Sequence, residues 1–170
     1  TEGNMFIQKE SENIPFVIVK TPQYSGNGKK RIINMISFYK NLFPTAKEYA
    51  NKYGKPDVIL ASSVHPLTLV AGIKIAKKFG VPCICEVRDL WPESIVAYGS
   101  LKRNSVIAKI LYLGEKWIYK NADKLIFTME GGKDYIADQK WDSENGGPIN
   151  NNTINHLNNG VHLERFHKNI

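Results

Sequence analysis

Four short apolar segments recur along the chain from residue 57 onward, and stretches with helical spacing separate them. The segments that read as strands are residues 57–62, 81–87, 124–129 and 153–157. Strands that alternate with helices of this length require right-handed crossovers and pair in parallel. The sequence therefore predicts an α/β fold: a Rossmann-like parallel sheet with helices on both faces.

Three helices are predicted between these strands from apolar residues that recur every three or four positions. The first contains Leu69, Val70, Ile73 and Ala76 and ends at Gly80. The second covers residues 104–121 and the third residues 131–140. The apolar face predicted for the second helix consists of Ile107, Ile110, Leu111, Trp117 and Ile118. The polar, turn-rich residues 142–152 are expected to form a surface loop.

The N-terminal part is predicted to hold one strand, at 14–20, and one long helix over residues 29–52. The helix is amphipathic and basic, and Pro44 is expected to bend it. Its apolar residues recur at helical spacing, and the basic residues near them are Lys29, Lys30, Arg31, Lys40, Lys47 and Lys52.

Polar residues follow each predicted strand of the sheet, at the edge where open α/β sheets bind ligands. In chain order they are Ser63 and His65, then Arg88, Asp89, Trp91 and Glu93, then Glu130, Gly131 and Gly132, and finally Asn159. Each group also has a structural interpretation. His65 could serve simply as the residue that begins a helix, and Gly131 and Gly132 could simply form a tight turn. Asp89 could cap a turn while Arg88 pairs with a neighbouring carboxylate. Together, helix N-termini beside a histidine and an arginine suit an anionic, hydroxyl-rich ligand.

Composition narrows the class of protein. The chain has 170 residues, enough for one domain, and a formal net charge of +7. That surplus indicates either an anionic partner, such as an acidic membrane or a phosphorylated substrate, or simply a basic soluble protein. The two cysteines, Cys83 and Cys85, lie on one face of a strand and are expected to be buried, reduced thiols below the polar edge. No metal-ligand cluster and no membrane-spanning segment is recognisable.

The chain resembles glycosyltransferase family 4. The resemblance is carried by residues 57–99, which include "EVRDLWPES", by residues 115–136, which include "EGGKDY", and by "NNGVHLERF" at 158–166; in all it covers about residues 14–167. Within the family the chain looks like the bacterial enzymes that build capsule or O-antigen polysaccharide. The resemblance implies one Rossmann-like domain over residues 1–170: the N-terminal, acceptor-side domain of a GT-B fold, without its first strand and without the C-terminal donor domain.

The resemblance also implies roles for the residues at the strand ends. Many members have His-Asp where this chain has Arg88 and Asp89, and that pair would face the cleft as the catalytic residues. Ser63, His65, Trp91, Glu93, Glu130, Gly131, Gly132 and Asn159 would contact substrate. Arginine does not release its proton, so Arg88 can orient oxygens but cannot act as a base. Trp91 could stack on a sugar ring or pack in the core.

The function implied is retaining transfer of a sugar from a nucleotide-sugar donor to a lipid-linked or saccharide acceptor. It needs no further cofactor, no metal and no nucleic acid. The expected location is the cytoplasm, with residues 29–52 as the contact to an anionic inner membrane. This chain alone is expected to be inactive. Two alternatives stay open: a non-catalytic acceptor- or membrane-binding subunit that needs a separate donor-domain chain, and a nucleotide-sugar epimerase of GT-B architecture.

Overall fold

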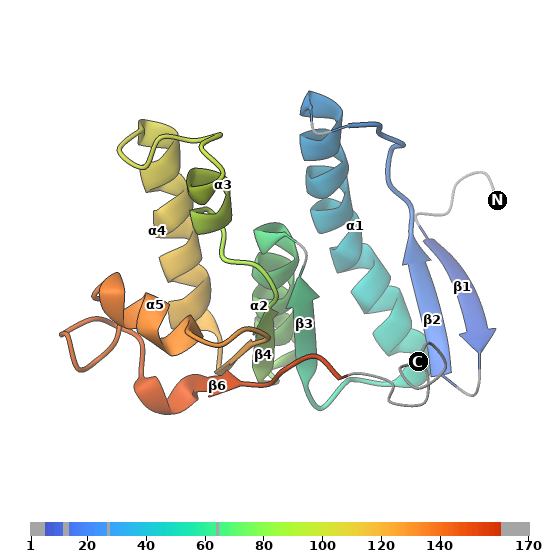
Figure 1. Ribbon diagram of the computed structural model, residues 1–170. Helices are drawn as coiled ribbons and strands as arrows, with labels where there is room; N and C mark the ends of the chain where they lie inside the picture. The colour runs from blue at the N-terminus through green and yellow to red at the C-terminus, as the bar shows by residue number, and fades with distance from the viewer. Residues whose placement is uncertain (1–5, 12–13, 27, 64, 161–170) are drawn as a thin grey trace, which may run out of the picture.

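The computed structural model describes residues 6–11, 14–26, 28–63 and 65–160 (Figure 1). Its centre is a four-stranded parallel sheet in the order β3-β4-β5-β6. The strands are β3 (Ile59–Ser63), β4 (Cys83–Val87), β5 (Lys124–Phe127) and β6 (Ile154–His156). The helices between them are α2 (Pro66–Phe79), α3 (Glu93–Ala97), α4 (Val106–Asn121) and α5 (Gly132–Asp138), and a 3₁₀ turn at Asn151–Thr153 precedes β6. The predicted Rossmann-like α/β class is confirmed, with most element ends within one or two residues of those expected.

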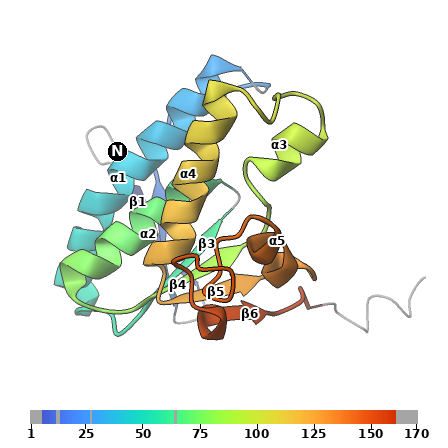
Figure 2. The same cartoon turned by 90° about the vertical axis from the view of Figure 1, so that its left-hand side faces the viewer.

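Helices α1, α2 and α4 lie side by side on one side of the sheet (Figure 2). The side chains that the sheet turns toward α2, α4 and α5 are buried: Cys83, Cys85 and Val87 on β4, and Leu125 and Phe127 on β5. Alternate residues point to the other face. There Leu60 is 61% exposed, and Ile84 and Ile126 are half-buried. The main core therefore lies between the sheet and the layer formed by α2, α4 and α5. Cys83 and Cys85 are both buried in this core, as predicted.

Close backbone contacts hold α2 against the sheet. A Cβ added at Gly72 would lie 2.4 Å from the Cβ of Ala61 on β3, so only glycine allows this approach. Pro66 occupies the first turn, where a missing N–H costs nothing, and α2 ends at Gly80 with φ +61°.

The strand predicted in the N-terminal part does not belong to the four-stranded sheet. The strand expected at 14–20 is β2 (Ile14–Val19), and it pairs antiparallel with β1 (Phe6–Ser11), a strand that the sequence analysis did not predict. The two form a separate sheet beside α1 (Lys29–Tyr53). Two amide side chains of α1 fasten it to the segment after β2. Asn41 donates to the Lys20 carbonyl at 2.8 Å, and Asn34 donates to the Pro22 carbonyl at 2.7 Å.

For α4, the helix predicted at residues 104–121, the predicted apolar face was partly wrong. Ile107 and Ile110 are more than 60% exposed and Trp117 is 38% exposed, whereas the fully buried residues of α4 are Ala108, Glu115, Ile118 and Tyr119. Apolar residues surround this helix, so their spacing alone did not identify the face that meets the core.

The segment 142–152 is a surface loop only at its tip. Asp142 is 2% and Ile149 is 1% exposed, while residues 143–146 are exposed. The Asp142 carboxylate accepts the backbone N–H and the side-chain amide of Asn145, at 3.0 and 2.8 Å, and Ile149 enters the core. The base of the loop is therefore part of the packed domain, which polar composition did not reveal.

Candidate functional site

The carboxyl ends of three strands align at one edge of the sheet. Ser63, Val87 and Phe127 end β3, β4 and β5, and they are register partners in the parallel pairing. His65 follows the first of these, Arg88 and Asp89 the second, and Glu130 the third. The structure thus brings the predicted residues to one edge, with Cys83 and Cys85 buried below it and their Sγ atoms 3.9 Å apart.

A small pocket opens at this edge, under the end of β4. Its lining includes Pro66 of α2, Arg88, Asp89 and Trp91 after β4, and Glu115 of α4. It offers about 20 Å³ to a water-sized sphere, room for about one water molecule. It is too small for a sugar ring, so a saccharide would lie over its mouth and could send one hydroxyl inward.

Arg88 and Asp89 are exposed at the mouth of this pocket. Neither side chain forms a hydrogen bond or an ion pair with another residue in the described ranges. The interpretation of Arg88 and Asp89 as an internally satisfied turn therefore has no support in their contacts. A guanidinium and a carboxylate at a strand end can together donate to and accept from the hydroxyls of one ligand.

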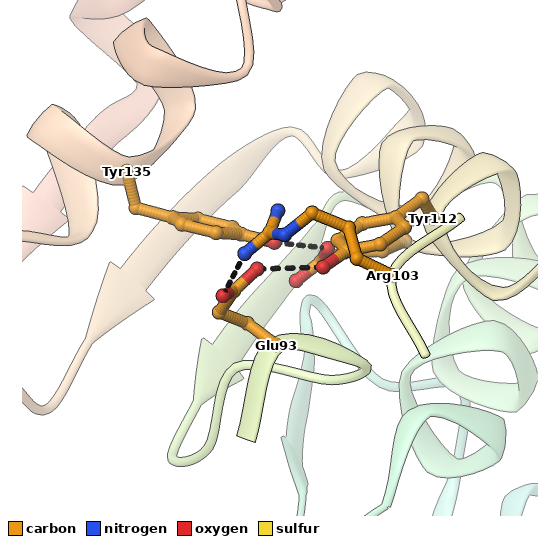
Figure 3. Close-up of polar contacts among 5 residues, drawn as sticks. Glu93, Arg103, Tyr112 and Tyr135 are labelled. Atoms are coloured by element: carbon orange, nitrogen blue, oxygen red, sulfur yellow. Dashed lines mark hydrogen bonds and ion pairs between the residues drawn. The ribbon is translucent and has the colours of Figure 1, made fainter. Parts of the chain in front are cut away.

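The corner after this pair is anchored in the protein. The Trp91–Pro92 peptide is cis, Pro92 is buried and Trp91 is half-buried. Glu93 forms an ion pair with Arg103 and accepts the Tyr112 hydroxyl at 2.6 Å (Figure 3). Burial and the carboxylate of Glu93 raise the pKa of Tyr112 to about 12. Both oxygens of Glu93 thus have partners within the chain, and these contacts join α3 to Arg103 and to α4.

His65 caps the start of α2 and turns toward α1. Its ring meets the ring of Phe38 edge-on, with 6.0 Å between centroids. Burial lowers the pKa of His65 below its ordinary value, and the charge of Arg31 lowers it further.

The glycine turn after β5 has two distinct constraints. Gly131 has φ +81°, a backbone conformation that favours glycine. A Cβ at Gly132 would lie 2.2 Å from Cγ of Phe127, so this residue permits α5 to pack on the sheet. Glu130 and Gly131 are exposed at the same edge, and Asn159 is exposed beyond β6. Ser63 ends β3, but its side chain lies outside the described residues, as do residues 161–166 of the "NNGVHLERF" segment.

Glu115 is the residue at this site that sequence reasoning missed. It is 3% exposed, and its two oxygens accept the hydroxyls of Tyr119 at 2.7 Å and Tyr135 at 2.6 Å. Burial raises the pKa of Glu115 to about 7, although the two hydrogen bonds oppose that shift. The available signal was position: Glu115 lies three and four residues before Ile118 and Tyr119, both buried on the same helix face.

Two kinds of feature are absent from the described ranges. No three or more His, Cys, Asp or Glu side chains gather there in a way that could hold a metal ion. None of the described helices is both long and apolar enough to cross a bilayer.

The structure defines an α/β protein of Rossmann-like kind, with polar residues at the carboxyl ends of its strands. Residues 16–151 match the family described as the glycosyl transferase 4-like domain. The chain belongs to this family, which makes it a glycosyltransferase domain. A comparison with curated proteins gives no match.

Proposed function

We propose that this chain is the acceptor-side domain of a retaining glycosyltransferase. The enzyme would move a sugar from a nucleotide-sugar donor to a lipid-linked or saccharide acceptor in the synthesis of a surface polysaccharide. The observation that carries the proposal is the exposed pair Arg88 and Asp89, unengaged by other described side chains, beside the half-buried Trp91 at a strand end.

The chemistry of the pair fits binding and orientation. Asp89 accepts a hydrogen bond from an acceptor hydroxyl, and Arg88 donates to hydroxyl or phosphate oxygens. Arg88 stays protonated and so does not serve as the base. In retaining transfer on one face of the donor sugar, a donor phosphate oxygen takes the acceptor proton. The protein then contributes positioning and stabilisation of the charge on the leaving diphosphate.

Binding to the purified chain tests the assignment. Hexyl β-D-glucoside, hexyl β-D-galactoside and hexyl N-acetyl-β-D-glucosaminide are titrated against ¹⁵N-labelled protein, and UDP-glucose is titrated in parallel. We expect at least one glycoside to shift the amide signals of Arg88, Asp89 and Gly131, and UDP-glucose to shift none of them. No sugar transfer from UDP-glucose is expected from this chain. Binding of UDP-glucose alone, or turnover of it, would contradict an acceptor-side domain.

Substitution of Arg88 separates a ligand contact from a structural one. Arg88→Ala should weaken glycoside binding about tenfold or more, as expected for a charge-assisted hydrogen bond. It should leave the melting temperature nearly unchanged, because the side chain is exposed and no ion pair with a described residue is lost. Lys55→Ala is the matched control, an exposed cation next to the amino end of β3. A collapse of the melting temperature with unchanged binding would make Arg88 structural.

The N-terminal part of α1 supports a membrane contact. Ile32, Ile33 and Ile36 are each more than 40% exposed, close in sequence to Lys29 and Lys30. Apolar side chains flanked by cations suit an anionic lipid surface, where each cation contributes about 1 kcal/mol. In liposome co-sedimentation, vesicles rich in anionic lipid should bind the chain, and neutral vesicles should not. Lys29→Ser with Lys30→Ser and Arg31→Ser should abolish binding, while Lys55→Ser with Lys133→Ser should not. Equal binding to both kinds of vesicle would remove this role.

A further inference from the structure

Helix α4 places two carboxylate-binding tyrosines and one carboxylate along the side that faces the site. Tyr112 holds Glu93 of α3, while Glu115 receives Tyr119 from its own helix and Tyr135 from α5. Both α3 and α5 begin within a few residues of the ligand edge: α3 follows the corner at Trp91, and α5 begins at Gly132. The polar contacts of α4 therefore fasten the two segments that carry the candidate site residues.

Glu115 has an unusual setting for a residue with only a fastening role. In the described part of the chain no Lys or Arg forms an ion pair with it, although its side chain is buried. Glu115 also lines the same pocket as Arg88 and Asp89. A buried carboxylate without a cation is costly to hold ionised, and an apolar residue or a glutamine would fill the same space at lower cost. A buried carboxylate at this edge is therefore better explained by the site than by the fold.

The two forms of this carboxyl group make different hydrogen bonds. The ionised carboxylate accepts from both tyrosine hydroxyls at once. The protonated carboxyl carries an O–H that needs an acceptor of its own, so one hydroxyl must turn round or move away. Tyr135 lies in the first turn of α5, and its backbone N–H bonds to the Gly131 carbonyl at 2.8 Å. A shift of Tyr135 is thus passed directly to the turn at the ligand edge.

We propose that Glu115 is a positioning residue of the acceptor site: its ionised carboxylate holds Tyr135, and through it the turn at Gly131 and Gly132, in the arrangement that binds acceptor beside Arg88 and Asp89. The proposal rests on the proposed function for its ligand. The groups that contact Glu115 or act on it electrostatically are Tyr112 and Tyr119 of α4, Tyr135 of α5 and Glu93 of α3. Arg88 and Asp89 line the same pocket, and Arg103 pairs with Glu93 and acts on Tyr112. Burial brings the pKa of Glu115 to about 7, so the switch between the two forms falls near neutral pH.

The first test needs no ligand. The amide signals of Gly131 and Gly132 are followed by NMR from pH 5.5 to 8.5 in the wild-type chain and in Glu115→Gln, Tyr135→Phe and Glu48→Gln. Glutamine keeps the shape of the side chain, and Glu48 is an exposed glutamate on α1 that serves as the matched control. We expect a transition near pH 7 in the wild type and in Glu48→Gln, and its loss in Glu115→Gln. In Tyr135→Phe the transition should no longer reach the glycines.

The second test adds hexyl β-D-glucoside at pH 6 and pH 8. Wild-type affinity should fall roughly three- to tenfold at the lower pH, the equivalent of about one hydrogen bond. Glu115→Gln should bind weakly at both values. His65→Asn removes the titratable histidine of the same edge; if Glu115 causes the pH dependence, the ratio of the affinities at the two pH values should stay that of the wild type in this variant, whatever its affinity.

The outcomes separate the two proposals. If the glycines report the transition but no glycoside binds, the proposed acceptor function fails while the coupling of Glu115 to the turn stands. If Gly131 and Gly132 do not respond to pH, or respond equally in Glu115→Gln, Glu115 does not position the turn. If His65→Asn removes the pH dependence of binding, the histidine is its cause and the assignment to Glu115 is overturned.

Discussion

Glu93 and Glu115 both accept a tyrosine hydroxyl at 2.6 Å, in opposite electrostatic surroundings. The side chain of Glu93 is 23% exposed and paired with Arg103, which is itself half exposed. Glu115 is almost fully buried, forms no ion pair with a described residue, and has a pKa near 7. The first carboxylate is paired with a cation and partly open to solvent, whereas the polar partners of the second in the described ranges are two hydroxyls. Similar hydrogen bonds therefore make one structural contact tolerant of change and the other sensitive to pH.

The largest expected effect comes from deleting the buried carboxylate. Glu115→Ala leaves the hydroxyls of Tyr119 and Tyr135 without their acceptor inside the core and opens a cavity. We expect the free energy of unfolding to fall by about 3–5 kcal/mol. Glu93→Ala is the matched comparison, and the loss there should be about 1–2 kcal/mol because water can reach the groups left behind. Urea unfolding of both variants at pH 6 measures the difference; equal losses would mean that burial does not separate the two networks.

The pH dependence of stability should differ in the same direction. The pKa of Glu115 is about 7 in the folded chain against about 4.5 when unfolded, so the folded state binds more protons between these values. Stability then falls as pH rises from about 4.5 to about 7, by roughly 3 kcal/mol, and is constant above. Glu115→Gln removes this contribution, so it should equal the wild type near pH 4.5 and exceed it at pH 8.

Chemical unfolding from pH 4.5 to 8 gives the free energy of unfolding of the wild type and of Glu115→Gln. In the difference between these two curves the contributions of the other carboxyl groups cancel. A constant difference from pH 4.5 to 8 would contradict the raised pKa. The expected gain in stability at pH 8 would accompany weaker acceptor binding. A site that requires an ionised buried carboxylate trades stability for function in this way.

The parts of the fold that the sequence predicted are those governed by strong hydrophobic periodicity. The four strands of the sheet and α1, α2 and α5 follow from apolar spacing, and the register of parallel strands then brings Arg88, His65 and Glu130 to one edge. The hairpin was missed because β1 consists mainly of polar residues, whose pairing with β2 is set by tertiary contacts.

The site was only partly predictable for a related reason. Residues at strand ends can be read from the chain, but a buried partner below them cannot. Glu115 was not singled out, and Ile107 and Ile110 were assigned to the core face, because the sequence does not say which side of α4 faces the sheet. For the same reason the sequence did not predict that Glu93 bonds to Arg103 and Tyr112, which follow it by 10 and 19 residues.

Removing one tyrosine hydroxyl from each carboxylate, Glu115 and Glu93, should reproduce the difference between them on a smaller scale. Tyr135→Phe leaves one oxygen of a buried carboxylate unsatisfied, and we expect a loss of about 1–3 kcal/mol at pH 8, where Glu115 is ionised. At pH 5.5 the loss should shrink, because the protonated carboxyl needs fewer donors. Tyr112→Phe should cost about 0.5–1.5 kcal/mol with no dependence on pH over this range, since Arg103 still pairs with Glu93. Thermal unfolding at both pH values distinguishes the two; a pH-dependent loss in Tyr112→Phe alone would invert the comparison.

The smallest effect is expected for the ion pair itself. Arg103→Met removes the partner of Glu93 and the cation that lies 5.6 Å from the centroid of the Tyr112 ring, while it keeps much of the aliphatic stem. Because the pair is open to solvent, the loss should be about 0–1 kcal/mol at low ionic strength. It should shrink further in 0.5 M NaCl, where the Debye length falls to a few ångströms. Urea unfolding with and without the salt measures this, and Lys55→Met, an exposed cation at the other edge, is the control. A loss above about 2 kcal/mol that resists salt would mean that Glu93 behaves as a buried charge, and the distinction between the two carboxylates would then lie in their partners rather than in their exposure.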